Sequence, residues 1–547
     1  MKILNRCWTL LLFAQICVLT DLPAARADAT TPVRFEVVDA HTHQPLPCRV
    51  YLQSKDGTNY HVASASPAGS AVPYDVKRSP ESLEIHSTVS AHPFTADLPP
   101  GEYTLTVERG KEYRPAERTF TLGTAPVEET IRLERWINMA ELRWYSGDTH
   151  VHRSLEELPN VMLAEDLNVA LPLSYWVRDA YTPPSRGDKS VAAKGELIRI
   201  DPTHVIWPMN TEYELFTVNG KRHTLGAVFA LNTIQRLRPA APPVGPIAAE
   251  ARRQGALLDL DKHSWPWSMM LVPVMDVDLF ELSNNHIWRT QFFFKQWTID
   301  QLPAGWNIDT DGDGFTEWGW TDFGFKTYYA LLNCGFPLRP TAGTASGVHP
   351  VPLGFGRVYV HLPDGFGYDQ WIAGLDAGRS FVTTGPMLLA TFNGKPAGTR
   401  FLHDAATTVE IEARVLSDTP IETVEIVKNG DVIPVQYETV QSENSGRYEY
   451  AIHESVPVDG TSWMAVRCFT AAPSDDHRRR FAHTAPVHVA INDRPLHPRR
   501  FETQFLMSLV EKEIARNRGI LAADELAEYE RALDVYRKLH ASAVPGE

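Results

Sequence analysis

Between residue 33 and about residue 138, the chain consists of short segments in which apolar and polar residues alternate, separated by clusters of Pro, Gly, Asp and Asn. A period of two places one set of side chains on the buried face of a strand. Many short strands with turn signals between them are typical of a β-sandwich. We therefore predict a sandwich here, with strands in VRFEVVD, CRVYLQS, EYTLTVERG, RTFTLG and TIRLERW.

The same alternation returns between about residues 393 and 494, for example in TVEIEARVLSDTPIETVEIVKNGDVI and SWMAVRCF. The dipeptide Asn429-Gly430 is a strong hairpin signal, because both residues tolerate a positive φ. A second β-sandwich is therefore predicted. Beyond it, FETQFLMSLVEKEIARNR and AADELAEYERALDVYRKLHA carry apolar residues at helical spacing, so we expect two amphipathic helices that dock on the neighbouring domain.

The N-terminus has the pattern of a signal peptide, because basic residues precede an apolar run and Ala25-Arg26-Ala27 forms a small-x-small cleavage site. We expect a periplasmic or secreted mature protein without a transmembrane segment, since no later stretch reaches the roughly 18 apolar residues of a spanning helix. The formal charge of −15 argues against nucleic acid as a partner. Cys48, Cys334 and Cys468 lack C-x-x-C spacing, so neither a disulfide scaffold nor a thiolate metal site is indicated.

Two stretches share the spacing D-x-H-x-H, VVDAHTHQP around His41 and His43 and SGDTHVHRS around His150 and His152. The first lies between two predicted strands and is expected to be an exposed turn. The second ends an apolar strand, whose period of two places Asp148, His150 and His152 on one face. Two imidazoles at this spacing can bind one cation, although a pair of hydrogen-bonded histidines at a strand end also fits the pattern.

Residues 141–390 resemble the CehA/McbA metallohydrolases, carbaryl-hydrolase-like relatives within the polymerase-and-histidinol-phosphatase (PHP) superfamily. The motifs that carry the resemblance are WYSGDTHVHR, AEDLNVA, YYALLNCGF, TAGTASGVHP, GRVYVHLPDG and GLDAGRSFVTTGP. The preceding sandwich looks like the regulatory domain of carboxypeptidases, in which the turn that holds His43 commonly carries a Gly. The resemblance implies a protein that is α/β plus all-β, with a PHP-like (β/α) barrel between two β-sandwiches. The expected parts are a signal peptide (1–27), a carboxypeptidase-regulatory-like β-sandwich (28–138), the metallohydrolase barrel (139–392), a β-sandwich (393–494) and C-terminal helices (495–547).

The resemblance also implies the ligands of a metal site. The positions that match the superfamily pattern are His150, His152, Glu212 and His263, a set of nitrogen and oxygen donors suited to one Zn²⁺, Mn²⁺ or Fe²⁺ ion. Such an ion lowers the pKa of its water to about 7, so the implied chemistry is hydrolysis.

Further residues are candidates for roles around this metal site. Asp148 and Asp261 are candidates to orient a ligand or accept a proton from water, with a plain structural role as the alternative. Arg153 and His349 are candidates for substrate binding, although an exposed Arg after a strand and a loop His are simpler interpretations. His223 is expected to be a surface or core residue. Four tryptophans are candidates either for the mouth of the site or for core packing: Trp265, Trp267, Trp288 and Trp297.

The chain departs from the superfamily pattern at two motifs. Where relatives have T-D-H, it reads PLSYW, with Tyr175 and Trp176, and where they have D-x-H, it reads GTASG, with Ala345 and Gly347. A three-metal cluster is therefore not expected. The predicted function is an exported metal-dependent hydrolase acting on an ester, carbamate, amide or phosphoester bond of a small-molecule or glycan-like substrate. The alternative is a catalytically degenerate PHP-like binding protein of the cell envelope.

The stretch DTDGDGFTE matches the first half of an EF-hand calcium loop through Asp309, Asp311 and Asp313. Trp320 replaces the bidentate Glu expected at the twelfth position, although Glu317 stands at the ninth. A structural Ca²⁺ and a solvated acidic loop are both compatible with this sequence.

Overall fold

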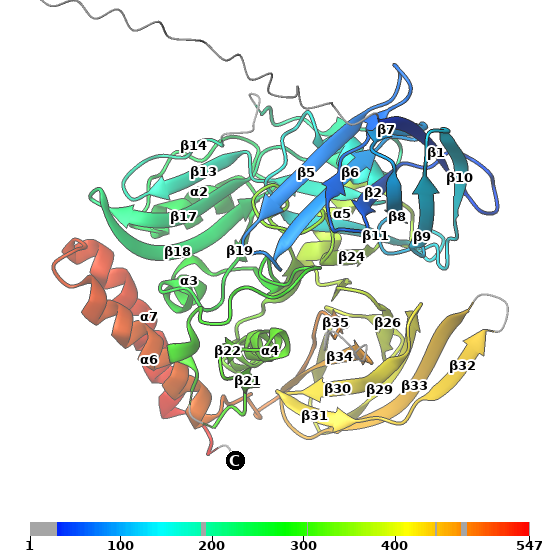
Figure 1. Ribbon diagram of the computed structural model, residues 1–547. Coiled ribbons are helices and arrows are strands. Elements are labelled where there is room, and N and C mark those ends of the chain that lie inside the picture. The colour runs from blue at the N-terminus through cyan, green and yellow to red at the C-terminus, as the bar shows by residue number, and fades with distance from the viewer. Residues whose placement is uncertain (1–29, 188–192, 304, 443–445, 472–478, 546–547) are drawn as a thin grey trace, which may run out of the picture.

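The computed structural model describes residues 30–187, 193–303, 305–442, 446–471 and 479–545, so the expected signal peptide lies outside the described residues. Within these ranges the protein is a mixed α/β structure, mostly β, with strands in several sheets and seven α-helices. Figure 1 shows the N-terminal strands in blue and the C-terminal sheets in yellow as separate layers, with the last two helices in red along one side.

Two N-terminal sheets face each other across a shared apolar core that includes Phe35, Val50 and Leu105. This sandwich-like pair agrees with the alternation in the sequence, because every second side chain from Val33 to Val37 is buried. The first sheet has the order β10 (Val127–Leu133), β1 (Thr31–Asp39), β7 (Phe94–Leu98), β4 (Ala63–Ser64). The second has the order β5 (Ala71–Lys77), β6 (Leu83–Val89), β2 (Cys48–Ser54), β8 (Gly101–Glu108), β9 (Ala116–Leu122), with β3 (Asn59–Tyr60) beside β2.

The turn between β1 and β2 holds His41 and His43 in exposed positions. The Asp39 carboxylate accepts hydrogen bonds from the backbone N–H groups of His41 (2.9 Å) and Thr42 (2.8 Å). His43 has a φ of 58°, the left-handed conformation that favours glycine. The prediction of an exposed turn is confirmed.

The central part contains two sheets that meet without forming a closed barrel among the described strands, so the expected barrel is not confirmed. They are joined where His152 N–H donates to Ser346 O (2.9 Å) and Ala345 N–H donates to His150 O (2.7 Å). The seven-stranded sheet has the order β14 (Ser185–Arg186), β13 (Tyr175–Asp179), β17 (Thr211–Val218), β18 (Lys221–Leu231), β19 (Leu257–Leu260), β20 (Leu279–Ser283), β23 (Arg339–Ala342). The twelve-stranded sheet runs through β15 (Ile198–Arg199), β16 (Val205–Ile206), β12 (Val169–Pro172), β11 (Trp144–Val151), β24 (Arg357–His361), β25 (Ser380–Thr383), β35 (Phe481–Thr484), β34 (Ser462–Thr470), β30 (Ile421–Lys428) and β31 (Asp431–Pro434), with β36 (Val487–Ile491) and β28 (Arg400–His403) attached.

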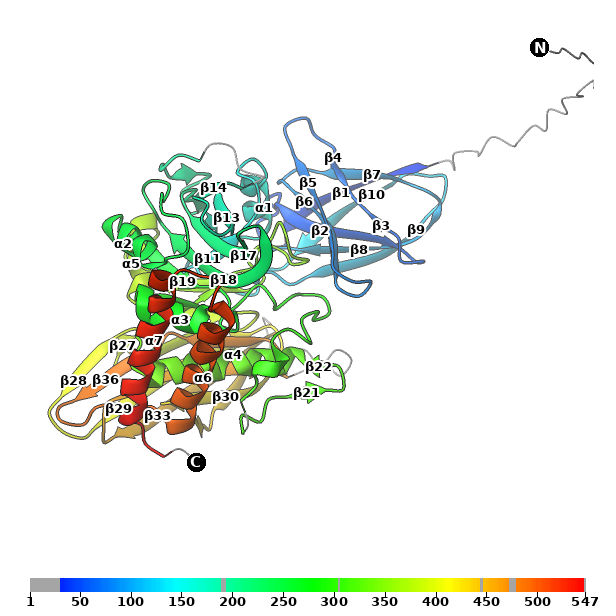
Figure 2. The same ribbon diagram turned by 90° about the vertical axis from the view of Figure 1, so that its left-hand side faces the viewer.

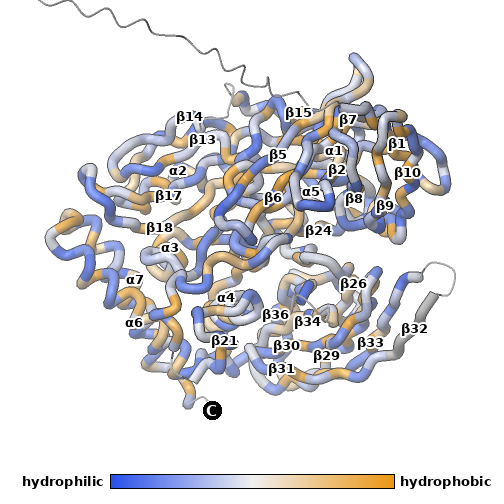
Figure 3. Tube along the Cα trace, in the orientation of Figure 1, coloured by the Kyte–Doolittle hydropathy of each residue, from blue (hydrophilic) through white to orange (hydrophobic). Residues whose placement is uncertain are grey.

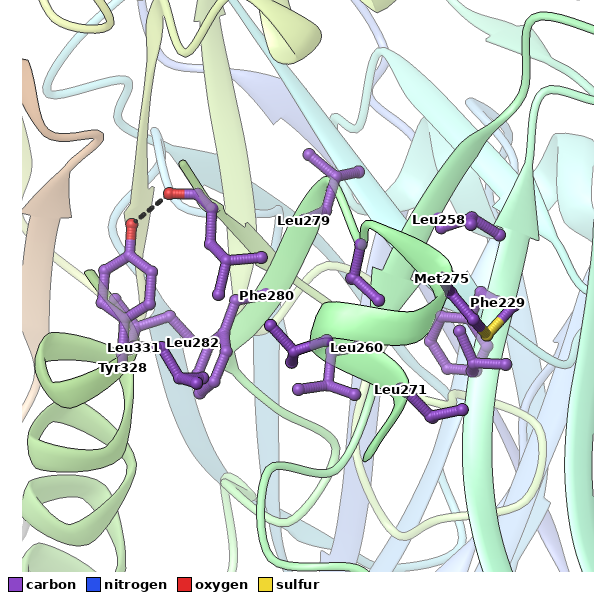
Figure 4. Packing of buried hydrophobic residues seen from close by; sticks show 14 of the residues in the cluster. Phe229, Leu258, Leu260, Leu271, Met275, Leu279, Phe280, Leu282, Tyr328 and Leu331 are labelled. Carbon is purple, nitrogen blue, oxygen red and sulfur yellow. Dashed lines mark hydrogen bonds between the residues drawn. The ribbon is translucent and has the colours of Figure 1, made fainter. Parts of the chain in front are cut away.

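Helices cover the seven-stranded sheet and bury its apolar side chains. Figure 4 shows Leu271 of α3 and Leu331 of α4 on either side of Leu260 and Phe280, and the Tyr328 hydroxyl donates to Leu338 O (2.8 Å). Full burial of each such side chain contributes about 1.5–3 kcal/mol. The α-helices of the whole described chain, not all of which cover this sheet, are α1 (Leu158–Ala164), α2 (Gly245–Arg253), α3 (Ser268–Met275), α4 (Glu317–Asn333), α5 (Tyr368–Asp376), α6 (Arg500–Asn517) and α7 (Ala523–Ala541), with a short 3₁₀ turn η1 (Ile299–Gln301).

A five-stranded C-terminal sheet packs against the β30, β34 and β35 end of the twelve-stranded sheet, and the two share one apolar core. The predicted second sandwich is therefore present in sandwich-like form. Because β25 pairs with β24 on one side and β35 on the other, the long sheet continues past the boundary expected near residue 392. The five strands have the order β27 (Lys395–Pro396), β26 (Met387–Phe392), β29 (Thr407–Ser417), β33 (Arg447–Val458), β32 (Glu438–Ser442), and a separate hairpin pairs β21 (Thr310–Asp311) with β22 (Gly314–Phe315).

Helices α6 and α7 dock on the central part, as predicted, and lie beside α3 in Figure 2. The Tyr536 hydroxyl donates to Met269 O (2.8 Å), and the Glu528 carboxylate accepts from the backbone N–H groups of Val244 (2.8 Å) and Gly245 (2.9 Å) at the start of α2. In Figure 3 both helices alternate between hydrophobic and hydrophilic residues along their length, as amphipathic helices do. No helix in the described part of the chain has the length and apolar character needed to cross a membrane.

Candidate metal centre

Four strands bring histidine and carboxylate side chains to one buried point between the two central sheets. His150 lies near the end of β11, Glu212 lies on β17, Asp261 follows β19 and Glu281 lies on β20. Each of these side chains is at most 1% exposed. Glu212 lies opposite Phe229 in the pairing of β17 with β18, and Phe229 lies opposite Asp259 in the pairing of β18 with β19. The strand register therefore fixes the spacing of these carboxylates across the sheet. The site is therefore built on strands, which are among the most rigid elements of a fold.

His150, His152 and Glu212 form the first group of donors that could hold a metal ion. The Nε2 atoms of the two histidines lie 3.3 Å apart, and His152 Nε2 lies 3.2 Å from Glu212 Oε2. Donor atoms about 2.0–2.1 Å from a tetrahedral ion are about 3.3–3.4 Å from one another. These three side chains could therefore hold a shared metal ion.

The other ring nitrogen of His150 faces two carboxylates. Nδ1 lies 3.1 Å from Glu281 Oε1 and 3.5 Å from Asp261 Oδ1. A ligand imidazole commonly donates its second N–H to a carboxylate, which fixes the ring orientation and leaves Nε2 unprotonated for a metal. Gly343 permits this approach, because a Cβ atom there would lie 1.8 Å from Glu281 Oε1 and 2.2 Å from His150 Cβ.

Lys262 places an ammonium group within a second cluster of carboxylates. The acidic groups of Glu212, Glu214 and Asp261 lie within 4.8 Å of one another. Lys262 Nζ pairs with Asp261 and lies 3.5 Å from Glu214 Oε1. Burial lowers the pKa of Lys262, but Asp261, Glu214 and Glu212 outweigh this effect and raise it. The position where a second ion would bind thus already holds a positive charge.

Carboxyl groups outnumber the one ammonium group in this buried region. Desolvation raises the pKa of Glu212 to about 8, with a further contribution from Asp261, and raises that of Glu214 to about 7. Burial also raises the pKa of Glu281 well above its usual range. Buried carboxylates resist ionisation unless a cation balances them, and one ammonium cannot balance all of them. The electrostatics of the site therefore favour binding of a divalent cation.

The structure does not bring the fourth expected ligand, His263, into any of these groups. Its ring lies 5.1 Å from that of Trp320 and 5.3 Å from that of Phe323, and neither ring nitrogen has a hydrogen-bond partner among the described residues. Desolvation lowers the pKa of His263 to about 3, so the imidazole is neutral.

Asp148 shares the strand face of His150 but is used differently. Its carboxylate accepts hydrogen bonds from the Thr344 hydroxyl (2.5 Å), Gly354 N–H (2.9 Å) and His150 N–H (3.0 Å). Burial raises its pKa to about 6 despite these bonds. Asp148 therefore ties the segment after β23 to the end of β11, and it belongs to none of the three donor groups.

The two candidates for substrate binding are both largely enclosed. Arg153 is 5% exposed, with its guanidinium 3.8 Å from the ring centre of Tyr74 in the N-terminal sandwich and its Nε 3.2 Å from Ser346 Oγ. It therefore joins the N-terminal sandwich to the site, contrary to the exposed position expected. The ring of His349 packs 5.6 Å from Trp288 and 5.9 Å from Phe294.

Aromatic side chains form part of the wall around the donors. The Trp176 ring lies 4.9 Å from that of His152, and Lys262 Nζ lies 4.8 Å from the centre of Trp265. Trp297 packs 5.7 Å from Trp265. Trp267 and Trp288, by contrast, are core residues with 0% exposure, while His223 pairs with Asn517 of α6 (2.7 Å).

The acidic loop at 309–317 has protein partners for its carboxylates. Lys295 Nζ lies 2.9 Å from Asp311 and 3.7 Å from Asp313, while Asp309 accepts from the hydroxyl of Thr316, the N-cap of α4 (2.7 Å). The three aspartates form no donor group within the described part of the chain. These contacts favour a lysine-paired loop and helix cap over a calcium site.

Sequence reasoning missed Glu281, Lys262 and Glu214. Each had a local signal: Glu281 is a carboxylate inside the wholly buried strand LFELS, and Lys262 stands among acidic residues in LLDLDKHSW. Glu214 lies two residues after Glu212 and therefore on the same strand face. Comparison of the chain with family models, curated proteins and solved structures gives no match.

Proposed function

We propose that the protein is an exported metal-dependent hydrolase of the CehA/McbA type, with one divalent transition-metal ion held by His150, His152 and Glu212. The observation that carries the proposal is the spacing of their three donor atoms, 3.3 Å and 3.2 Å, which fits a single ion. The proposal includes a PHP-like arrangement of the central strands, supported by the position of the donors at strand ends. The sequence pattern at residues 1–27 supports export.

The residues around the donors have separate tasks. A bound divalent metal supplies Lewis acidity and lowers the pKa of water to about 7. Glu281 accepts from His150 Nδ1 and holds its ring, while Lys262 balances part of the negative charge of Asp261 and Glu214. Since Asp261 Oδ1 lacks a hydrogen-bond partner in the described structure, this oxygen is the candidate to accept a proton during hydrolysis.

The proposed substrate is a small molecule with an ester, carbamate, amide or phosphoester bond and a flat apolar or sugar-like part. Trp176 supports this, because its ring lies beside the ligand His152, at a position where relatives carry a ligand. A substrate stacked on this ring would lie next to the metal. Arg153 contributes indirectly in this scheme, since it holds the segment around Ser346 that pairs with the end of β11.

The second candidate function is a catalytically degenerate binding protein of the cell envelope. Tyr175 and Trp176 favour it, because aromatic side chains replace potential ligands there. The same site would then hold a ligand without cleaving it.

Metal content is the first test. Elemental analysis of the mature protein should give about one transition-metal ion per chain, and a His150→Ala/His152→Ala variant should lose it. A wild-type protein that takes up no metal when supplied with Zn²⁺, Mn²⁺ or Fe²⁺ would contradict the hydrolase proposal. For a metal-bound protein, a panel of aryl esters, carbamates, amides and phosphodiesters then separates the two functions, since turnover lost with His150 and His152 supports the enzyme.

A further inference from the structure

A separate cleft of about 630 Å³ lies between the twelve-stranded sheet and the five-stranded C-terminal sheet. Trp144 and His361 line one side, at the start of β11 and the end of β24, and Leu389, Pro396 and Ile452 line the other. The volume falls within the roughly 300–1,000 Å³ of small-molecule sites. Trp144 stands six residues before His150 on one strand, so the cleft is about 20 Å from the metal centre.

An aromatic surface forms one wall of this cleft. The half-buried Trp144 ring lies 5.0 Å from the His361 ring, tilted by 31°, and 5.0 Å from the buried Phe381 ring. Burial, and then the nearby Arg379, lower the pKa of His361, so its imidazole is neutral at physiological pH. The facing aliphatic side chains leave a slot suited to a flat apolar group.

The charged side chains that line the cleft differ in whether they already have an ion-pair partner. On the C-terminal wall, Arg414 pairs with Glu449 (2.8 Å) and His453 Nδ1 lies 3.6 Å from Glu412. Arg379 lines the opposite wall, and its side chain makes no hydrogen bond or ion pair with the described residues. One unpaired cation beside an aromatic surface selects a monoanion, whereas a dianion would meet Glu412 without a second cation to balance it.

We propose that this cleft binds a small aryl carboxylate, with its ring against Trp144 and its carboxylate on Arg379. A guanidinium offers two parallel N–H donors that match the two oxygens of a carboxylate, and such charge-assisted pairs are about twice as strong as neutral hydrogen bonds. Ring stacking adds about 0.5–1.5 kcal/mol. The proposal is independent of hydrolysis, since it uses no residue of the metal centre.

Isothermal titration calorimetry with 1-naphthoate and its neutral isostere 1-naphthamide tests the proposal. The wild type should bind the acid at least about tenfold more tightly than the amide, a difference of about 1.4 kcal/mol. Arg379→Gln should remove this preference and leave the amide affinity unchanged. Arg414→Gln is the matched control, because Arg414 lines the same cleft but is paired with Glu449, and it should keep the preference.

The His150→Ala/His152→Ala variant excludes binding of the carboxylate at the metal centre, and it should bind 1-naphthoate as the wild type does. Trp144→Leu should weaken both ligands, and thermal melting would report whether that variant is folded. Equal affinities for acid and amide, an unchanged preference in Arg379→Gln, or loss of binding with the two histidines would each overturn the proposal.

Discussion

Replacing Lys262 by Met tests whether a lysine takes the place of a second metal ion. Met keeps an unbranched side chain of similar length but removes the ammonium that pairs with Asp261 and Glu214. Removal of one partner from a buried ion pair costs about 3–5 kcal/mol, since the remaining charge is uncompensated. With Asp261 0% exposed and Lys262 3% exposed, this range applies to the metal-free variant. For a domain of this size the loss corresponds to a Tm lower by roughly 6–20 °C.

Metal should restore part of that stability. With the ammonium gone, Glu212, Glu214 and Asp261 can hold an added cation, so metal content should rise from about one to about two ions per chain. An ion at 100 times its dissociation constant contributes about 2.7 kcal/mol, which recovers more than half of the loss. Elemental analysis after dialysis against Zn²⁺ or Mn²⁺, together with thermal melts with and without chelator, measures both quantities.

Two controls make the result specific. Lys262→Arg keeps the positive charge and should keep one ion. Lys295→Met removes a more exposed lysine that pairs with Asp311, and it should cost no more than about 1 kcal/mol and leave metal content unchanged. If Lys262→Met folds with unchanged Tm and still binds one ion, Lys262 has no such role.

Three further predictions address the sequence assignments. His41→Asn/His43→Gly should leave metal content unchanged and stability within about 0.5 kcal/mol, because the turn is exposed, and metal loss in that variant would show that the assignment of the turn is wrong. Burial raises the pKa of Glu212 to about 8 in the metal-free protein, so below pH 8 a metal ion must displace a proton to bind. The metal affinity measured by calorimetry should therefore fall about tenfold for each pH unit below 8 and be constant above pH 8. A flat affinity profile from pH 6 to 8 would contradict this. Tyr175→Asp/Trp176→His should raise metal content by elemental analysis while lowering turnover of any substrate that the panel identifies, and unchanged turnover would argue against stacking on Trp176.

Local periodicity predicted much of the β architecture. Strand alternation located both sandwich-like regions, and Pro-bounded, polar residues between strands identified the turn at His41 and His43. The two terminal helices followed from apolar residues at helical spacing. The expected closed barrel is not confirmed, because its closure depends on pairing between strands far apart in the chain, which no local pattern encodes.

Residues of the candidate site could be predicted only where a motif on a single strand identified them. His150, His152 and Glu212 lie together, as the resemblance implied. Long-range packing decides the remaining residues. Tyr74, a residue of β5 in the N-terminal sandwich, covers Arg153 and so removes it from the surface where sequence alone placed it.

The role of Asp148 also depends on long-range packing, here on Thr344 and Gly354. The segment after β23 folds over the end of β11 and supplies the donors that engage the Asp148 carboxylate. Strand periodicity describes a side chain's face but not what that face meets, so a residue expected beside the metal instead fixes a loop.

The twelve-stranded sheet also constrains how such a protein can diversify. Its strand β25 is paired on both sides, with β24 before the expected boundary and β35 nearly one hundred residues after it. Recombination that exchanged the C-terminal segment at residue 392 would leave β25 with an open edge, and exposed edges promote aggregation. The C-terminal segment is thereby linked, through β25 and β24, to the strand that carries His150.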